Sequence, residues 1–481
     1  MSGRVVVCWL CLAALSETGC ADPVRETTPT LQVHAPVGRP NFILIVLDDA
    51  NPEDLSYMPI VQRELVERGT TFRRAYTTTS LCCPARASIL TGEYAHNHRV
   101  RTNKRATGGF PFFHASGDEA STLAVWLQNA GYRTGLIGKY LNLYPDNLDD
   151  YVPPGWSDWH ALVAPSSNET IGYYDFSMVE NGTTVAYPSV YQTDVLTEKA
   201  MTFIRTSADT AFFLYLAPFA PHAPATPAPR DAGAFASEPL PMPPSFNEAD
   251  VTDKPTYVDT LPLLDGPGQM AYMTELYRNR LASLLAVDDM VGQIINQMQR
   301  LRLQRNTYII LTSDHGFHIG QHRLRPGKDL LYEEDLTIPL VMRGPSVSWH
   351  RYRTELALNI DIAPTVAALA GIGAPDADGR SLVPLLGAST PASWREAFLA
   401  ETWDSEKAGI KWSIAAIHTR QYSFVEWSNG EDELYDNLAD PYQLDNAFRT
   451  SPLWRIGWLS GWLDRLRTCH GTTCRLAEDG P

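Results

Sequence analysis

The sequence predicts an α/β fold, in which helices cover both faces of a mostly parallel sheet. Short continuous apolar runs recur along the chain, as expected of strands that are buried on both faces. They span residues 41–47 (NFILIVL), 132–137, 211–216, 307–312 and 338–342. Helical patterns lie between them at residues 121–129, 193–204 and 272–301. Strands that alternate with helices are typical of a parallel sheet with helices on both sides.

The length and order of the predicted elements change near the C-terminus, which indicates a second, smaller domain. Shorter strands at residues 412–418 and 422–427 precede a last helix at 452–467, which predicts an α+β arrangement. With 481 residues the chain is also too long for one compact core. We therefore assign residues 39–377 to a larger domain and residues 378–481 to the smaller C-terminal one.

Two further segments have a recognisable pattern. Residues 174–187 predict a β-hairpin, because the Asn181-Gly182 pair in their middle suits a two-residue turn with positive φ angles. Residues 217–268 are rich in proline and irregular. A loop of this length in a compact protein is often functional.

Composition excludes some classes of protein. Hydrophobic residues make up 44% and charged residues 20% of the chain, as in ordinary globular proteins. The formal net charge of -16 argues against a nucleic-acid partner, which would favour a basic excess. It also argues against long-range attraction of polyanions, although a small basic pocket can still bind one anionic group.

The N-terminus predicts export. Arg4 precedes an apolar run at residues 5–15 and then small residues, which is the pattern of a signal peptide, here residues 1–21. Cleavage after Ala21 would release a secreted or periplasmic protein. Alternatively, Cys20 carries a lipid that anchors the protein to a membrane at the cell surface, although Glu17 stands where that signal prefers an aliphatic residue. A cytosolic protein with an apolar start is the third alternative. Residues 22–38 form a polar linker.

The cysteines outside the leader fall into two pairs. Cys469 and Cys474 lie five residues apart in a polar tail and can close a small disulfide in an oxidising compartment. Cys82 and Cys83 are adjacent and have no obvious partner. In an exported protein such a pair calls for another explanation.

Acidic residues follow two of the predicted strands. Asp48-Asp49 follows the strand at residues 41–47, and Asp314-His315 follows the strand at 307–312. Ligands of open α/β sheets bind at the carboxyl ends of parallel strands, so these side chains should converge at one edge. Several carboxylates together suit a hard divalent cation such as calcium. Either pair alone is explained as well by a helix cap or a turn, whereas the two together favour a metal site.

The segment L-C-C-P-A-R-A-S-I-L-T-G, residues 81–92, predicts a short helix with a nucleophile at its start. Pro84 suits the first turn and Gly92 suits the end. Cys82 would then lie at the helix N-terminus, where free N–H groups favour an anion, and Arg86 is one turn further on. A nucleophile, an anion-binding helix end and a metal are the components of displacement at a sulfuryl or phosphoryl centre.

This segment resembles the signature of the sulfatase family, Cys-x-Pro-x-Arg followed by Thr-Gly. In that family the cysteine is oxidised to formylglycine by a maturation enzyme. Cys82 has Pro84 and Arg86 at the required offsets, whereas Cys83 lacks the proline. The resemblance covers roughly residues 40–446. It implies an alkaline-phosphatase-like α/β/α sandwich, with a large mixed but mostly parallel sheet and a smaller C-terminal α+β domain.

The resemblance also implies a metal site and its ligands. One Ca²⁺ per chain would be bound by Asp48, Asp49, Asp314 and His315, with the modified Cys82 completing the coordination shell.

Four basic residues match sulfatase positions that act on the sulfate ester. Arg86 would hold the formylglycine hydrate, and Lys139, in Gly-Lys-Tyr, would bind the sulfate. Lys328, in Gly-Lys-Asp, would bind it from a second side. His222, in Pro-His-Ala-Pro, would lie near the leaving oxygen. Without the surrounding motifs, each lysine would be interpreted as a solvated surface charge.

The family's chemistry explains why these groups occur together. The aldehyde hydrates to a diol, and one hydroxyl attacks sulfur while a metal lowers its pKa. The lysines neutralise charge on the sulfate oxygens. Either His222 or Lys328 protonates the departing alcohol. The second hydroxyl then expels sulfate, a step that an unmodified serine or cysteine lacks.

Three segments resemble one branch of the family, that of N-acetylglucosamine-6-sulfatases and heparan endosulfatases. They are Gly-Lys-Tyr-Leu-Asn at residues 138–142, Tyr-Ala-His-Asn-His at 94–98 and residues 314–321. Leu141 stands where many arylsulfatases carry histidine. The long basic insertion of the endosulfatases is missing, so we expect an enzyme that acts at chain ends or on small sulfated glycans.

The sequence leaves three alternatives open. They are an arylsulfatase or another carbohydrate sulfatase of broad specificity, a phosphonate or phosphate ester hydrolase on the same scaffold, and a non-catalytic glycan-binding relative. The expected partners are a sulfated carbohydrate and the maturation enzyme. A membrane enters only through a lipid at Cys20.

Overall fold

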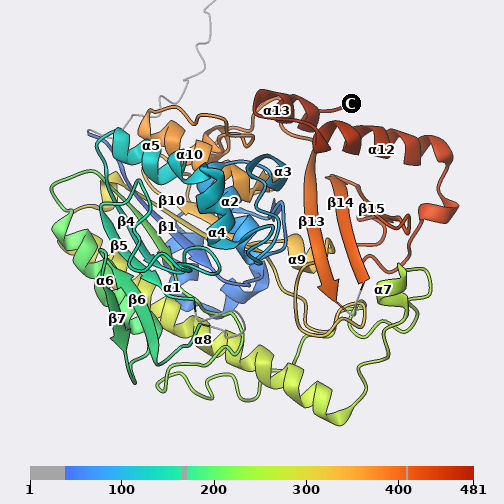
Figure 1. Cartoon of the computed structure of the whole chain (residues 1–481), viewed down its shortest axis with the longest axis horizontal. Helices are drawn as coiled ribbons and strands as arrows, with labels where there is room; N and C mark the ends of the chain where they lie inside the picture. Colours follow the sequence, from blue (N-terminus) through green and yellow to red (C-terminus); the bar gives the residue numbers. More distant parts are fainter. Residues whose placement is uncertain (1–37, 165–170, 408–409) are drawn as a thin grey trace, which may run out of the picture. The chain divides into compact units, whose positions relative to one another are not determined.

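The computed structural model describes residues 38–164, 171–407 and 410–481 (Figure 1). The predicted leader with Cys20, and all of the predicted linker except Gly38, lie outside the described residues. The described residues all belong to one compact unit, Pro36–Pro481. The boundary between residues 377 and 378 stays a prediction.

A ten-stranded sheet forms the centre of the fold. Its strand order is β11-β2-β10-β9-β1-β8-β4-β5-β6-β7. The strands are, in that order, Arg351–Arg353, Thr70–Phe72, Leu340–Arg343, Thr307–Ser313, Asn41–Leu47, Phe212–Ala217, Arg133–Gly138, Asp158–Leu162, Phe176–Glu180 and Thr184–Tyr187. The five strands from β9 to β5 are mutually parallel, whereas β10, β6 and β7 run antiparallel to their neighbours. The predicted large, mixed and mostly parallel sheet is confirmed.

The register of the central strands places their carboxyl ends side by side. Asn41 on β1 pairs with Thr307 on β9, and Leu47 pairs with Ser313. The chain keeps this pairing one residue beyond the strand, because the Asp314 amide donates to the Leu47 carbonyl at 3.1 Å. The acidic residues after β1 and β9 are therefore neighbours in space.

Helices cover the sheet on both faces, as the alternating pattern predicts (Figure 1). On one face lie α2 (Cys82–Thr91), α5 (Leu123–Asn129) and α10 (Ile362–Ala370), and on the other lie α6 (Gln192–Thr206) and α8 (Pro267–Arg300). β1 contributes alternate side chains to the two cores. Phe42, Leu44 and Val46 enter the first, and Ile43, Ile45 and Leu47 enter the second. This double burial explains the continuous apolar run in its sequence.

The predicted hairpin is formed by β6 and β7, which pair antiparallel. Asn181 and Gly182 have φ angles of 47° and 85°, as a two-residue turn of this kind requires.

The C-terminal part contains a separate four-stranded antiparallel sheet with two helices. The sheet runs β13 (Ala397–Lys407), β14 (Ile410–Thr419), β15 (Tyr422–Trp427) and β16 (Glu433–Asp436), and the helices are α12 (Leu453–Arg467) and α13 (Thr472–Glu478). Cys469 and Cys474 form the disulfide that the sequence allows, which joins the segment after α12 to α13, with an S–S distance of 1.95 Å. The smaller α+β arrangement is confirmed.

The remaining strands and helices are short. They are β3 (Ala75–Tyr76), β12 (Ala357–Leu358), α1 (Pro59–Val61), α3 (Ala95–His98), α4 (Gly109–Ser116), α7 (Thr256–Asp259), α9 (Glu333–Leu336) and α11 (Val383–Leu386). Among the residues that the structure describes, no helix is both long and apolar enough to cross a membrane.

Candidate active site

Three carboxylates and one imidazole meet at the carboxyl edge of the sheet. Asp48 and Asp49 follow β1, and Asp314 and His315 follow β9. The Asp49 amide donates to Asp314 Oδ1 at 3.1 Å, and His315 Nε2 lies 3.4 Å from Asp49 Oδ1. All four residues are buried. The structure thus brings together the two acidic pairs that the sequence places at strand ends.

Cys82 is the first residue of α2 and faces this edge. The helix ends at Gly92, whose φ of 77° is the left-handed conformation that favours glycine. Cys82 Sγ lies 3.4 Å from His315 Nε2 and 3.2 Å from Lys328 Nζ. Burial raises the pKa of this thiol, but the charges of Lys139, Lys328 and His315 outweigh it and lower the pKa to about 5.

Cys83 has the opposite environment. It is fully buried in the apolar core beneath α2, and burial raises the pKa of its thiol to about 12. A thiol of this kind is unreactive. The two adjacent cysteines therefore lie in different environments, Cys82 beside the charged groups at the edge of the sheet and Cys83 in the core.

Each of the three carboxylates is paired with a cation. Lys139 Nζ lies 2.5 Å from Asp48 Oδ2, and Arg86 Nε donates to Asp314 Oδ2 at 2.9 Å. Lys328 forms an ion pair with Asp49. Burial alone would raise the pKa of each carboxyl, but the neighbouring positive charges lower all three below the ordinary value. The carboxylates are therefore ionised.

The backbone before Lys139 approaches the next strand closely. Gly138 has a φ of 110°, and a Cβ atom there would lie 2.1 Å from the Ala217 carbonyl oxygen at the end of β8. The Lys139 amide donates to the same oxygen at 2.8 Å. Only glycine permits this contact, which directs Lys139 across the strand ends toward Asp48.

His222 comes from the proline-rich loop and lies at the mouth of the site. Its Nε2 is 3.7 Å from Asp49 Oδ2, and its Nδ1 is 2.7 Å from the Ala223 carbonyl. The side chains of His222 and Lys328 are 21% and 14% exposed, whereas Cys82 is 1% exposed. The site therefore opens on the side of His222 and Lys328.

The side chains suit a hard divalent cation. One group of ligand atoms, from Asp48, Asp49, Cys82 and His222, lies within 4.8 Å of one another, and so does a second group from Cys82, Asp314 and His315. Asp48 Oδ1 is buried without a hydrogen-bond partner in the described part of the chain. A buried carboxylate oxygen without a donor is unfavourable, and a cation would satisfy it.

Arg280 also supports the site, and the sequence analysis missed it. It projects from α8, is buried, and donates from Nη2 to the Asp49 carbonyl at 2.6 Å. It stacks on Phe317 at 4.4 Å. Asp49 has a φ of 70°, a conformation that is uncommon for a non-glycine residue and that this hydrogen bond helps to hold. The only sequence feature that could have indicated Arg280 is its position as an arginine on the apolar face of a long predicted helix.

The His-Asn-His segment that follows α2 makes internal hydrogen bonds. His98 is buried, with Nε2 2.9 Å from Ser88 Oγ, and burial lowers its pKa to about 3. His96 Nδ1 lies 2.8 Å from Glu401 Oε2, and its Nε2 lies 3.0 Å from the Cys469 carbonyl. These contacts connect α3 to α2 and to the C-terminal part. The histidines of this segment therefore have a structural role in packing.

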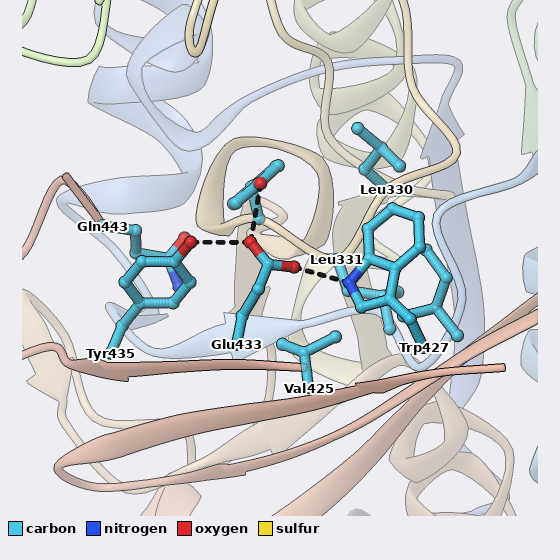
Figure 2. A pocket seen from close by; sticks show the side chains of 9 residues that line it. Leu330, Leu331, Val425, Trp427, Glu433, Tyr435 and Gln443 are labelled. Atoms are coloured by element: carbon cyan, nitrogen blue, oxygen red, sulfur yellow. Dashed lines mark hydrogen bonds between the residues drawn. The ribbon is translucent and has the colours of Figure 1, made fainter. Parts of the chain in front are cut away.

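A small cavity of about 10 Å³ lies against the C-terminal sheet, around Glu433. Figure 2 shows the Glu433 carboxylate between Tyr435 and Trp427, which donate to it at 2.6 Å each. Tyr332 donates to the same carboxylate at 2.8 Å. The cavity is far smaller than a ligand pocket, so this cluster is a packing feature.

Comparison with known proteins identifies the family. The family model described as Sulfatase matches residues 40–372, more than half of the chain. The chain belongs to the sulfatase family. A second model, N-sulphoglucosamine sulphohydrolase, C-terminal, matches residues 320–456. Sulfatases generally use formylglycine and a divalent metal.

Two of the similar proteins come from animals. A putative extracellular sulfatase Sulf-1 homolog of Caenorhabditis elegans is 37% identical over 76% of this chain and 51% of its own length. The chain thus spans about half of that relative. The human N-acetylglucosamine-6-sulfatase is 32% identical over 92% of this chain and 87% of its own length.

A solved structure shares the fold. A protein in complex with its substrate D-glucosamine-2-N,6-O-disulfate is 25% identical to this chain, with a TM-score of 0.75. The match covers 92% of this chain and 99% of the other. It confirms the predicted α/β sulfatase architecture.

Proposed function

We propose that this protein hydrolyses sulfate esters with a formylglycine made from Cys82 and a calcium ion bound by Asp48, Asp49, Asp314 and His315. The observation that carries the proposal is the placement of Cys82. Its sulfur lies within 3.4 Å of both His315 and Lys328, at the edge where three buried carboxylates meet. The other cysteine of the motif is buried in the core.

The side chains divide the work of binding and charge neutralisation. Formylglycine supplies a hydroxyl nucleophile at position 82, and calcium supplies a Lewis acid that lowers the pKa of that hydroxyl. Lys139 and Lys328 bind the sulfate oxygens from two sides and stabilise the charge that develops on them. Arg86 holds Asp314 in place through its guanidinium, in addition to its expected role beside the formylglycine hydrate.

Two groups are placed to protonate the leaving alcohol. His222 and Lys328 are the more exposed members of the site, so the organic part of the ester lies on their side. Nδ1 of His222 can donate to the Ala223 carbonyl, which leaves Nε2 to carry a proton toward the site. His222 is therefore our choice for the general acid, and Lys328 for the sulfate-binding cation.

We propose 6-O-sulfated N-acetylglucosamine at the end of a glycan as the substrate. The Lys-Tyr-Leu-Asn run supports this branch. Leu141 is apolar and buried, so it adds no polar group to the site at the position where many arylsulfatases carry histidine. The human relative is named for this sulfate position, and the solved relative binds a 6-O-sulfated glucosamine. Specificity must come from hydrogen bonds to the sugar, since the sulfate is common to all candidates.

The protein's location is also a proposal. The disulfide between Cys469 and Cys474 supports an oxidising compartment, in agreement with the predicted signal peptide. A maturation enzyme must meet the chain before α2 is buried, because Cys82 is 1% exposed in the folded protein.

A panel of sulfated sugars tests the substrate. The panel contains 6-O-, 3-O- and 2-O-sulfated sugars beside an aryl sulfate and an aryl phosphonate, and kcat/KM is compared. We expect the highest value for the 6-O-sulfated N-acetylglucosamine. A higher value for the aryl sulfate or for a 2-O-sulfated uronate would assign another branch, and preference for the phosphonate would refute the sulfatase activity.

A further inference from the structure

Lys328 lies in a short loop that is held at both ends by backbone hydrogen bonds. On the near side, Gly327 and His318 exchange two hydrogen bonds, of 2.9 and 3.1 Å. On the far side, the Leu330 amide donates to Asp335 Oδ2 at 3.0 Å, and Ser80 Oγ donates to the Leu330 carbonyl at 2.6 Å. The path of the backbone on both sides of Lys328 is thereby fixed.

Both ends of this loop are connected to a single carboxylate. Asp335 is fully buried, and while Oδ2 accepts from Leu330, Oδ1 lies 2.7 Å from His318 Nδ1. The Asp335 carbonyl accepts from the Gly316 amide at 2.9 Å, directly after His315. Asp335 thus joins the Lys328 loop to the turn that carries Asp314 and His315.

The chain approaches itself closely at this point. A Cβ atom on Gly316 would lie 2.1 Å from the Glu334 carbonyl oxygen, so the turn after His315 packs directly against the backbone before Asp335. Beyond Leu330, the segment packs on the C-terminal sheet, where Figure 2 shows Leu330 and Leu331 beside the Glu433 cluster. The segments on both sides of the Lys328 loop are therefore closely packed, and the hydrogen bonds of Asp335 connect them to the loop.

We infer that Asp335 is a positioning residue that, through His318 and Leu330, holds the Lys328 ammonium beside Asp49 and Cys82. Asp335 is buried and both of its carboxylate oxygens accept hydrogen bonds, so it acts through other residues. The inference rests on the proposed function in one respect, namely that Lys328 binds the sulfate. A small displacement of a group that orients the substrate is enough to reduce the rate strongly.

The chain offers a matched control four residues further along. His322 Nδ1 lies 2.7 Å from Glu248 Oε2, and both residues are buried, as in the pair of His318 and Asp335. The His322 amide donates to the Ser245 carbonyl instead of to the Lys328 loop. Glu248 Oε1 also lies 3.4 Å from Lys254 Nζ, which is outside the Lys328 loop. Converting either carboxylate to an amide therefore makes the same chemical change beside a buried histidine.

The experiment compares Asp335→Asn with Glu248→Gln in the full-length, matured protein. In Asp335→Asn the amide nitrogen cannot accept, so one end of the loop loses its hydrogen bond. We expect kcat/KM for a sulfate ester to fall about tenfold or more, and the inhibition constant of inorganic sulfate to rise about fivefold. Glu248→Gln should change both by less than about twofold, while the melting temperatures of the two variants fall similarly.

Two results would overturn the inference. One is a kinetic effect in Glu248→Gln as large as in Asp335→Asn, and the other is an Asp335→Asn enzyme with wild-type kinetics and wild-type sulfate inhibition.

Hydrogen exchange tests the same inference without turnover. Peptides covering residues 318–332 should exchange faster in Asp335→Asn than in Glu248→Gln, because one of the two hydrogen bonds that Asp335 accepts, from Leu330 or from His318, is lost. If the wild-type protein cleaved no sulfate ester, the proposed function would fail, yet this measurement would still decide the role of Asp335. Equal exchange in the two variants would refute it.

Discussion

The Lys328 ammonium lies 3.2 Å from the Cys82 sulfur. The same ammonium is paired with Asp49, one of the carboxylates at the end of β1. A positive charge therefore lies beside both the nucleophile position and one of the proposed metal ligands. Burial lowers the pKa of Lys328, but the charges of Asp49 and Cys82 outweigh it and raise this pKa well above its ordinary value. A sulfate group entering from the exposed side would meet this cation first.

The first prediction concerns the two cysteines. Cys82→Ala should abolish turnover, because position 82 carries the nucleophile, and Cys83→Ala should keep most of it. Tandem mass spectrometry of the tryptic peptide 75–86, which contains both cysteines, should place formylglycine at position 82. An active preparation with only unmodified cysteine, or with the modification at position 83, would contradict the proposal.

The second prediction concerns the metal. Asp314→Asn removes a charged oxygen from the group at the edge of the sheet, so calcium should bind more weakly and raise the melting temperature less than in the wild type. Asp378→Asn is a suitable control, because Asp378 is also fully buried but accepts from the amides of Tyr94 and Gly471 instead. Calcium stabilisation that survives in Asp314→Asn unchanged would exclude this residue as a ligand.

The third prediction is a pH dependence of stability. Burial lowers the pKa of His96, but its hydrogen bond to Glu401 raises it more, to about 8 from 6.5, and Asp378 adds to the increase. A histidine whose pKa is raised by folding stabilises the protein fully below the unfolded pKa, and the contribution disappears as the pH rises through the folded value.

The difference in the free energy of unfolding between wild type and His96→Gln isolates this contribution from those of other titrating groups. It should shrink by about 2 kcal/mol between pH 6 and pH 9, measured by urea denaturation. A constant difference across this range would show that folding leaves the pKa of His96 unchanged.

The chemistry-bearing residues could be predicted from sequence where they follow a strand or begin a helix. Asp48 and Asp314 converge because β1 and β9 are parallel and in register, and a run of apolar residues reveals both strands. Pro84 and Gly92 mark the beginning and end of α2, which fixes the position of Cys82.

The supporting residues could not be predicted in this way. Arg280 contacts the Asp49 carbonyl across 231 positions of sequence, and no local pattern encodes that contact. The strand β13 was also missed, because it lies at the edge of its sheet and mixes acidic and apolar residues. The predicted strand at 338–342 begins two residues later, at Leu340, and runs antiparallel, a direction that composition does not specify.

The fourth prediction concerns the Glu433 cluster of Figure 2. Glu433→Gln should lower the free energy of unfolding by about 2 kcal/mol or more, because an amide nitrogen would face either the Trp427 N–H or the two tyrosine hydroxyls. Glu431→Gln, at a less buried position in the loop that precedes β16, should cost less than about 1 kcal/mol. Urea denaturation measures both, and equal losses would contradict the structural importance of the cluster.

The last prediction separates the two candidates for the general acid. Protonation of the leaving oxygen matters most when the alcohol is a poor leaving group, as a sugar hydroxyl is, and little when it is an activated phenol. His222→Gln should therefore lower kcat about 100-fold or more for a sugar sulfate, but only a few-fold for 4-nitrophenyl sulfate. Lys328→Met should impair both substrates alike and weaken inhibition by inorganic sulfate, because its ammonium binds the group that all substrates share. If the dependence on the leaving group appeared in Lys328→Met and was absent from His222→Gln, the two roles would have to be exchanged.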